Sequence, residues 1–403
     1  MILPLIVLLP IIFLLLKKKP EIVLIFSVIY PVIRLPFFVL FDYEIGNLNI
    51  SIEALGILSV LSLTLNDKFR FRLDLYFPIL FLLFASSFLG LILAYASIPT
   101  TVIFLGLKLL LLPFLVATVA RFDEAVKSKL IISLLYIQII NCLAAIVETV
   151  LGVSRLQNFG LQYGTNIRNF DSYLRAPGLA LTNYELGSFS SIVLVTVYLL
   201  LTDQLDIKRK ISRNLQFLSG ISALLCLALS NFRSGMVFSI VAIIFGELLA
   251  RRKIASSSLF IILSSSFVLI AVLGNFFLLN SNSFVERQDK WTQLLSNYDW
   301  VIGSGIGFSG AASLSSYAPI GSAIVTDNQF ITLLLQFGLV GFCFLMAIFL
   351  YLFYKGNATS KSLIIALLVV MCFAEVWDLT VFFSICLYLI FSGIISKHKL
   401  IHP

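Results

Sequence analysis

Long runs of apolar residues, separated by short polar or basic segments, follow one another from end to end of the chain. Most runs reach the roughly 17–25 residues that an α-helix needs to cross a bilayer. No stretch shows the alternation of apolar and polar residues that is typical of a membrane β-barrel. The pattern therefore predicts an all-α fold, a polytopic integral membrane protein with about 12–13 transmembrane helices.

Basic residues gather between these runs, for example at Lys17–Lys19 and at Lys208–Arg213. Basic clusters belong on the cytoplasmic side of a membrane protein, and two spans separate each cluster from the next. The predicted spans are about 2–16, 22–41, 50–65, 75–96, 98–120, 130–152, 186–202, 215–229, 235–250, 257–280, 329–353, 362–377 and 379–396. This topology places the N-terminus outside and the C-terminus inside, or leaves about twelve crossings if the short first run does not cross.

Two segments between the spans are long, residues 153–185 and residues 281–328, and both lie on the predicted outer side. Loops of more than about 15 residues are usually functional or disordered. Between them these two segments contain Trp, Tyr, Gly and short apolar patches, so we expect both to be partly ordered. The chain is then a single transmembrane domain, 1–403, with a first periplasmic loop at 153–185 and a large periplasmic loop at 281–328.

Composition supports a membrane protein, because the chain is 60% hydrophobic and only 12% charged. In such a protein the net charge of +8 reports topology, so no nucleic-acid partner is expected. The five cysteines lie inside apolar runs without metal-ligand spacing and are interpreted as small hydrophobic residues. The chain has no Asp-x-Asp pair, and we expect neither a metal nor a cofactor.

Six basic residues lie on the predicted outer side, against the topological bias. They are Arg155, Arg168, Arg175, Arg233, Arg287 and Lys290. Five of the six are arginine, whose planar guanidinium binds phosphate bidentately. Their presence favours an anion held at the outer membrane surface, and a diphosphate joined to a lipid tail would lie at this depth. The alternative for Arg155, Arg168 and Lys290 is a solvated loop charge.

Two further basic residues lie within predicted spans. Arg34 is in the outer half of the second span, where it either contributes to the anion site or extends outward to water. Lys108 is near the middle of the fifth span. A charge at this depth is a candidate functional residue, although a structural ion pair explains it equally well.

Four short motifs follow one another on the predicted outer side, within roughly residues 150–350. The first two are Arg175-Ala176-Pro177-Gly178 followed by Thr182-Asn183, and Arg233-Ser234-Gly235. The other two are Arg287 and Trp291 followed by Gly303-Ser304-Gly305-Ile306-Gly307, and Asp327-Asn328 nine residues before Gly338-Leu339-Val340-Gly341. Together with the many spans, these motifs resemble the bacterial O-antigen ligase and polymerase superfamily.

The resemblance implies a glycosyltransferase that takes an oligosaccharide from undecaprenyl diphosphate, on the periplasmic face of the bacterial inner membrane. Ligases of this superfamily carry histidine at the position of Asp327. Here the only histidines are His398 and His402, in the predicted cytoplasmic tail. The departure favours an O-antigen polymerase (Wzy-type), which joins lipid-linked repeat units, with a chain-length regulator as a partner. The alternatives are a ligase that acts on lipid A-core and, in another class, a flippase for lipid-linked oligosaccharide.

Breaking the bond between a sugar and a diphosphate places negative charge on the leaving group, which cations stabilise. We therefore expect Arg175, Arg233 and Arg287 to bind the diphosphate. Asp327 is the candidate general base for the acceptor hydroxyl, with helix capping or substrate positioning as the alternative. The candidate substrate-binding residues are Arg34, Lys108, Arg168, Asn183, Glu185, Trp291 and Asn328. The Gly303–Gly307 stretch predicts a tight loop near the sugar or diphosphate, and Gly338–Gly341 predicts close helix packing.

Overall fold

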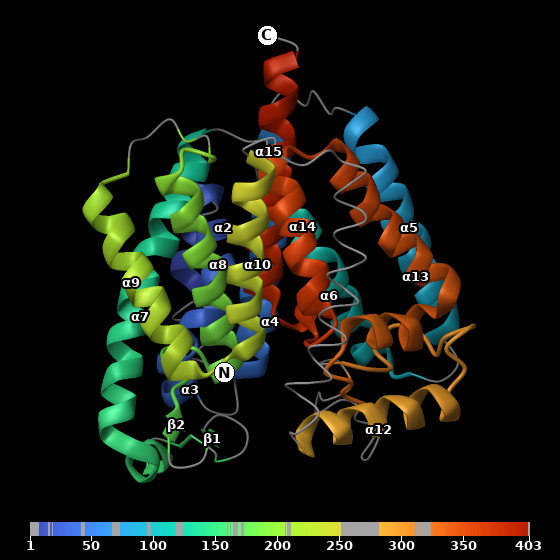
Figure 1. Cartoon of the computed structure of the whole chain (residues 1–403), viewed down its shortest axis with the longest axis horizontal. Coiled ribbons are helices and arrows are strands. Elements are labelled where there is room, and N and C mark those ends of the chain that lie inside the picture. Colours follow the sequence, from blue (N-terminus) through green and yellow to red (C-terminus); the bar gives the residue numbers. More distant parts are fainter. Residues whose placement is uncertain are drawn as a thin grey trace. The chain divides into compact units, whose positions relative to one another are not determined.

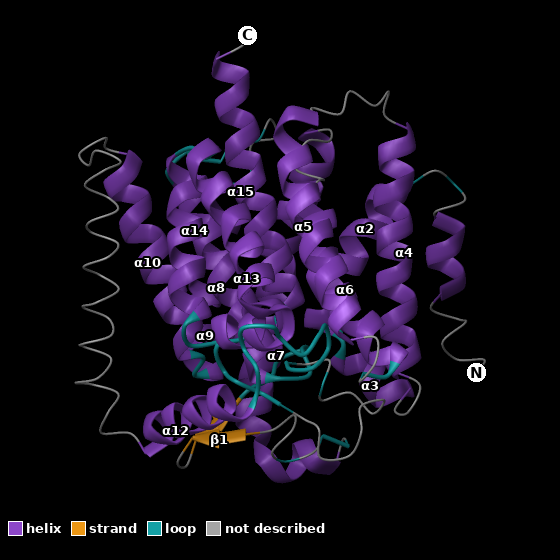
Figure 2. Cartoon of the chain, turned by 90° about the vertical axis from the view of Figure 1, so that its right-hand side faces the viewer, coloured by secondary structure: helices purple, strands orange, loops and turns teal. Residues whose placement is uncertain are grey.

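The computed structural model describes residues 8–14, 17, 19–41, 45–66, 73–94, 98–117, 124–158, 160–161, 163, 168–170, 173–205, 207, 211–250, 282–310, 313 and 324–401. These residues are predominantly helical (Figures 1 and 2). They fall into two compact units. The first unit comprises Met1–Arg70, Leu112–Ile240 and Leu379–Pro403, and the second comprises Phe71–Leu111 and Val241–Asp378.

Six of the described helices are long and apolar enough to cross a membrane. They cover Thr100–Ala117, Val126–Asn158, Asn183–Leu201, Arg213–Ser230, Arg233–Ala250 and Gln329–Lys355. Shorter apolar helices cover Pro20–Ile33, Ser51–Val60, Pro78–Ala94, Ala358–Met371 and Thr380–Ile395. This arrangement is that expected of a polytopic helical membrane protein. The predicted span 257–280 and parts of the span 2–16 lie outside the described residues.

The helices of the first unit are α2 (Pro20–Ile29), α3 (Leu35–Phe41), α4 (Ile45–Asn66), α7 (Glu124–Asn158), α8 (Asn183–Leu201), α9 (Arg213–Ser230) and α15 (Thr380–Ile401). Helix α8 is largely buried, and it packs most extensively on α9. Its buried serines Ser188, Ser190 and Ser191 are small enough for neighbouring backbones to approach closely. Helices α6 (Thr100–Ala117) and α10 (Arg233–Ala250) contribute residues to both units.

The predicted span 22–41 is not one continuous helix. Helix α2 ends at Ile29, a single 3₁₀ turn, η1, follows at Tyr30–Ile33, and α3 begins at Leu35. Pro31 lies in the turn and cannot donate the backbone hydrogen bond that a continuing helix needs. Arg34 therefore lies at a break between helices, where its Nε donates to the Pro31 carbonyl at 3.2 Å.

The segment 153–185 contains a small two-stranded β-sheet within the otherwise helical fold. Strand β1 (Arg168–Phe170) pairs in antiparallel fashion with β2 (Tyr173–Arg175), and Arg168 lies opposite Arg175. Helix α7 also extends into this segment, past a break at Gly152. The described part of this segment thus contains the end of α7 and the two strands.

The second unit contains α5 (Leu73–Ala94), α12 (Asn282–Asn297), α13 (Gln329–Lys355), α14 (Ala358–Met371) and the 3₁₀ turn η4 (Val376–Asp378). Helix α13 packs extensively along α5. Helix α12, in the predicted large loop, runs across the end of this helical layer (Figures 1 and 2). Its half-buried Trp291 and Leu294 pack on Ile331 and Leu335 of α13.

Helix α13 is broken at Gly338, whose φ of 65° and ψ of −177° are not helical. The two halves of α13 run in different directions (Figure 1). At the break, the carbonyls of Leu335 and Gln336 accept hydrogen bonds from Ser304 (2.7 Å) and Gly305 (2.9 Å). Because a lipid core offers no water, exposed backbone groups must find partners in the protein, and the loop supplies them.

The glycine loop, residues 303–307, is threaded between α5, α6 and α13 of the second unit. The Ile306 amide donates to the Gly90 carbonyl at 3.0 Å, and the Ile306 side chain is buried. A Cβ added to Gly90 or Gly106 would lie 2.4 or 2.5 Å from that side chain. The glycines of the loop and of the helices therefore serve close packing.

We predict that Gly338→Ala destabilises the protein more than Gly152→Ala. Both glycines have nearly the same backbone conformation, φ 65° and ψ −177° against φ 75° and ψ 172°. An L-residue there costs about 1–3 kcal/mol at either position. A Cβ at Gly338 would in addition lie 2.1 Å from the Ile302 carbonyl oxygen, whereas Gly152 has nothing within 4 Å. Thermal unfolding of the purified variants in detergent measures the difference, and equal shifts would contradict the packing of the loop against the break.

Candidate functional site

The predicted site residues are divided between the two units. Arg34, Arg168, Arg175, Asn183, Glu185 and Arg233 belong to the first unit. Lys108, Arg287, Trp291, Asp327 and Asn328 belong to the second. The structure brings residues together within each unit, and the convergence of all three arginines on one diphosphate stays a prediction.

Arg287 and Asp327 form an ion pair in the second unit. The Arg287 Nε lies 3.5 Å from Asp327 Oδ2, and the two side chains are 43% and 51% exposed. Arg287 comes from α12, and Asp327 precedes α13, so the pair joins two segments that are forty residues apart in sequence. This exposed pairing of a guanidinium with a carboxylate is the principal feature of the candidate site.

Asp327 is held in a left-handed backbone conformation, with φ 53°. It is not the cap of α13, because Asn328 is the N-cap residue. The Asn328 Oδ1 accepts the amides of Phe330 (3.0 Å) and Ile331 (3.2 Å). The capping alternative for Asp327 is therefore wrong, and its carboxylate remains on the surface.

Two residues expected to bind substrate in this unit form hydrogen bonds within the protein, and their contact with substrate stays a prediction. Asn328 is 9% exposed, and besides capping α13 it donates from Nδ2 to the Cys372 carbonyl at 3.1 Å. The Trp291 indole donates from Nε1 to the Thr326 carbonyl. Its ring packs beside buried Ile324 and Ile331. Trp291 thus attaches α12 to the segment before α13 through its indole N–H and its ring.

Glu375 is a carboxylate that contacts Thr326, the residue before Asp327, and the sequence did not predict it as part of the site. The predicted span 362–377 included it, but α14 ends at Met371 and leaves it in the turn before η4. Its Oε1 accepts the Thr326 amide at 2.7 Å. An acidic residue inside an otherwise apolar run was the available signal, since such residues are rare in spans.

In the first unit, backbone hydrogen bonds fix the segment that follows Arg175. The Gly178 amide donates to Glu148 Oε2 at 2.7 Å, and the Leu179 amide donates to Asn141 Oδ1 at 2.9 Å. Both acceptors project from α7 and are buried. Gly178 has φ 62°, and an added Cβ would lie 3.0 Å from Asn141 Oδ1. The polar side chains of α7 therefore hold the loop that carries Arg175.

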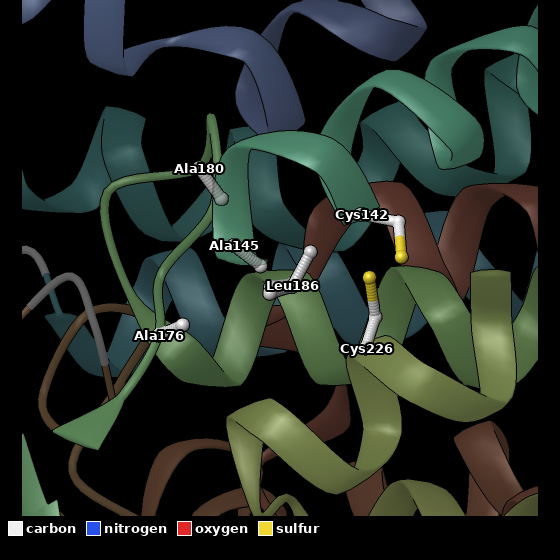
Figure 3. Packing of buried hydrophobic residues seen from close by; sticks show 6 residues of the cluster. All are labelled: Cys142, Ala145, Ala176, Ala180, Leu186 and Cys226. Carbon is white, nitrogen blue, oxygen red and sulfur yellow. The ribbon is translucent and has the colours of Figure 1, made fainter. Parts of the chain in front are cut away.

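Small buried residues complete this attachment (Figure 3). Ala176 and Ala180 of the loop belong to one apolar cluster with Ala145 of α7 and Leu186 of α8. Cys142 and Cys226 complete the cluster, and their sulfur atoms point toward one another in Figure 3. Both cysteines are buried and free, in agreement with their interpretation as small hydrophobic residues.

Arg233 lies next to the same loop. The Ala176 amide donates to the Leu229 carbonyl at 3.2 Å, so the chain just after Arg175 contacts the end of α9. Asn231 ends α9 in the left-handed conformation, and Arg233 is the first, exposed residue of α10. The structure thus brings the Arg175 segment against the turn that carries Arg233.

Three other candidates in the first unit pair within the protein. The Arg34 guanidinium forms an ion pair with Glu185, and the two side chains are 19% and 20% exposed. Glu185 also accepts the Leu181 amide at 3.2 Å. Asn183 is buried and donates to the Ser230 carbonyl at 3.1 Å, which joins α8 to the end of α9. Arg34, Asn183 and Glu185 therefore stabilise the frame around the loop.

The remaining candidates are placed by their elements alone. Arg168 begins β1, opposite Arg175. Lys108 lies in the middle of α6 and is half-buried. Among the residues that the structure describes, no three His, Cys, Asp or Glu side chains gather where they could hold a metal ion.

Comparison with known proteins identifies no relative. No family model, curated protein or solved structure matches the chain significantly. The functional assignment therefore depends on the chemistry of the residues themselves. Exposed guanidinium groups can bind an anionic group bidentately, and an exposed carboxylate can accept a proton.

We predict that the Arg34–Glu185 pair is coupled in stability. Glu185→Ala leaves a largely buried guanidinium without its carboxylate, which should cost about 3–5 kcal/mol. The double variant Arg34→Ala/Glu185→Ala should be less destabilised than Glu185→Ala alone. Thermal unfolding in detergent measures the stability of the single and the double variant.

The matched control for these single and double variants is the pair Lys129–Glu21. Its Nζ and Oε1 atoms are 3.6 Å apart, and the two side chains are 49% and 22% exposed. Water screens such a pair, so Glu21→Ala should cost about 1 kcal/mol or less. Additive effects of Arg34→Ala and Glu185→Ala would contradict the coupling.

Proposed function

We propose that this protein is an O-antigen-type polysaccharide polymerase: a glycosyltransferase that joins undecaprenyl-diphosphate-linked repeat units on the periplasmic face of the inner membrane. The observation that carries the proposal is the exposed ion pair of Arg287 with Asp327. One partner is a cation suited to a diphosphate, and the other is a carboxylate suited to a hydroxyl proton. The four sequence motifs support the same assignment through their resemblance to the superfamily.

The proposed reaction breaks the bond between the anomeric carbon of the donor glycan and its diphosphate oxygen. The oxygen of an acceptor hydroxyl forms the new bond to that carbon, its proton passes to the Asp327 carboxylate, and undecaprenyl diphosphate leaves. Arg175, Arg233 and Arg287 stabilise the charge that develops on the diphosphate. Cations placed in advance act more strongly on the transition state than on the ground state.

The ion pair is compatible with this mechanism because it is loose. The Nε–Oδ2 distance of 3.5 Å is longer than a charge-assisted hydrogen bond of about 2.7–2.9 Å. Both side chains are about half exposed, so an incoming diphosphate can compete for the Arg287 guanidinium. Release from Arg287 leaves the Asp327 carboxylate available to the acceptor hydroxyl.

Asp327 also bears on the choice between polymerase and ligase. The superfamily's ligases have histidine at this position, and here a carboxylate takes its place. A carboxylate at the start of α13 can act as the base without any histidine on the periplasmic side. Polymerisation of lipid-linked repeats without lipid A-core distinguishes the two activities, since a ligase would modify core and form no ladder.

Lys108 supports the flippase as a second candidate, because an intramembrane charge fits a transport path. It lies half-buried in the middle of α6, whereas Arg287 and Asp327 lie at the surface. A flippase predicts that Lys108→Ala traps repeat units inside the cell while Arg233→Ala is harmless. The polymerase predicts that Arg233→Ala abolishes the ladder.

We predict that Arg175→Ala, Arg233→Ala, Arg287→Ala and Asp327→Asn each lower the rate of ladder formation from lipid-linked repeats in vitro. Loss of one positioned donor to a developing oxyanion costs about 100- to 1000-fold in kcat. Arg287→Lys keeps the charge but loses the planar fork, so its activity should lie between those of Arg287→Ala and the parent protein. Gel analysis of the glycan ladder gives the rates.

Arg155→Ala is the matched control, because Arg155 is an exposed arginine in the same predicted periplasmic loop as Arg175. This variant should form ladders at the parent rate. Full activity in Asp327→Asn and Arg287→Ala would refute the proposed site, and equal losses in Arg155→Ala and Arg175→Ala would indicate a general charge effect.

A further inference from the structure

We infer that Glu375 is a positioning residue for the Arg287–Asp327 pair, and that it acts through Thr326. The catalytic part of this inference rests on the proposed function. The hydrogen bonds that carry it are a property of the fold. Glu375 lies in the turn between α14 and η4, far in sequence from both members of the pair.

One oxygen of Glu375 is surrounded by hydrogen-bond donors. Its Oε1 lies 2.7 Å from the Thr326 amide nitrogen, 2.8 Å from Thr326 Oγ1 and 3.0 Å from Thr332 Oγ1. Thr326 and Thr332 are 1% and 3% exposed. Three hydrogen bonds to this one oxygen hold Thr326 and Thr332 against the turn that carries Glu375.

Thr326 in turn fixes the residues on both sides of the site. Its Oγ1 accepts the Asn328 amide at 3.1 Å, and its carbonyl accepts the indole N–H of Trp291. Asp327 is therefore enclosed between two residues that are both held in place. Asp327 has a left-handed backbone, with φ 53°, and its side chain is 51% exposed.

The same contact positions Arg287. Trp291 follows Arg287 by four residues on α12, so both side chains lie on one face of that helix. The hydrogen bond from Trp291 to the Thr326 carbonyl therefore places the side of α12 that carries Arg287 opposite Asp327. Glu375 thus acts on the carboxylate through the backbone of Thr326 and on the guanidinium through Trp291.

Two more bonds join the turn after α14 to the start of α13. The Trp377 amide donates to Gln329 Oε1 at 2.9 Å, and Asn328 Nδ2 donates to the Cys372 carbonyl at 3.1 Å. The turn after α14 therefore holds the first residues of α13 in place through hydrogen bonds. Glu375 supplies the carboxylate contact between this turn and Thr326.

The experiment compares Glu375→Ala with Glu375→Gln in the full-length protein in detergent. Glutamine keeps an oxygen that can accept the Thr326 amide, whereas alanine removes every acceptor. We expect Glu375→Ala to lower kcat of ladder formation about 100-fold, with KM for the lipid-linked donor almost unchanged, because a small misplacement of a reacting group has this effect. Glu375→Gln should recover most of the activity.

A double-mutant cycle with Asp327→Asn separates positioning from a general loss of structure. If Glu375 acts through Asp327 as well as Arg287, then adding Glu375→Ala to Asp327→Asn causes a smaller loss than in the parent protein, because only the effect on Arg287 remains. Multiplicative losses would overturn the inference. Should Glu375→Ala fail to fold, Thr332→Val removes one donor to the carboxylate, and the same non-additivity with Asp327→Asn is expected.

Hydrogen exchange of a peptide covering residues 324–332 gives a readout that needs no activity. Glu375→Ala should speed exchange of the Thr326 amide, and Glu375→Gln should not. Unchanged exchange in Glu375→Ala would refute the inference even if the protein is a polymerase. Faster exchange together with full activity of Asp327→Asn would instead refute the proposed function and leave the hydrogen-bond frame in place.

Discussion

The second unit depends on one constraint: backbone groups freed inside a membrane must be paired within the protein. Helix α13 opens at Gly338, and the amides of Ser304 and Gly305 satisfy the carbonyls that the break frees. This pairing fixes the first half of α13 at one end. At the other end, Asn328 and Thr326 are bound by the turn after α14. Asp327 is therefore presented from a segment that is held at both ends.

The sequence predicts the membrane helices well because their signal is local. Apolar runs and basic clusters mark where most helices lie, and Pro31 could have indicated the break in the span 22–41. The break at Gly338 had no such signal, because a glycine pair in a helix indicates close packing in most proteins. It arises only because a loop from elsewhere in the chain supplies the missing partners.

The residues of the candidate site also divide into those that the sequence predicted and those that only the fold reveals. Arg287 and Asp327 were predicted from charge and motif, and the fold pairs Arg287 of α12 with Asp327, which lies just before the N-cap of α13. Trp291 and Asn328 were expected to contact substrate, yet their polar groups bind the protein, since burial requires a partner for each donor. Glu375 escaped prediction because hydropathy does not show where α14 ends.

The spacing between Asn328 and Gly338 has a geometric consequence. The intervening residues, Gln329 to Phe337, form helix, and each residue of an α-helix turns the chain by about 100° and advances it by about 1.5 Å. Deletion of one of these helical residues would rotate the Asp327 carboxylate by about a quarter turn around the helix axis, relative to the glycine loop. The number of residues in this short helix thus determines the direction in which Asp327 faces, and the present length orients it toward Arg287.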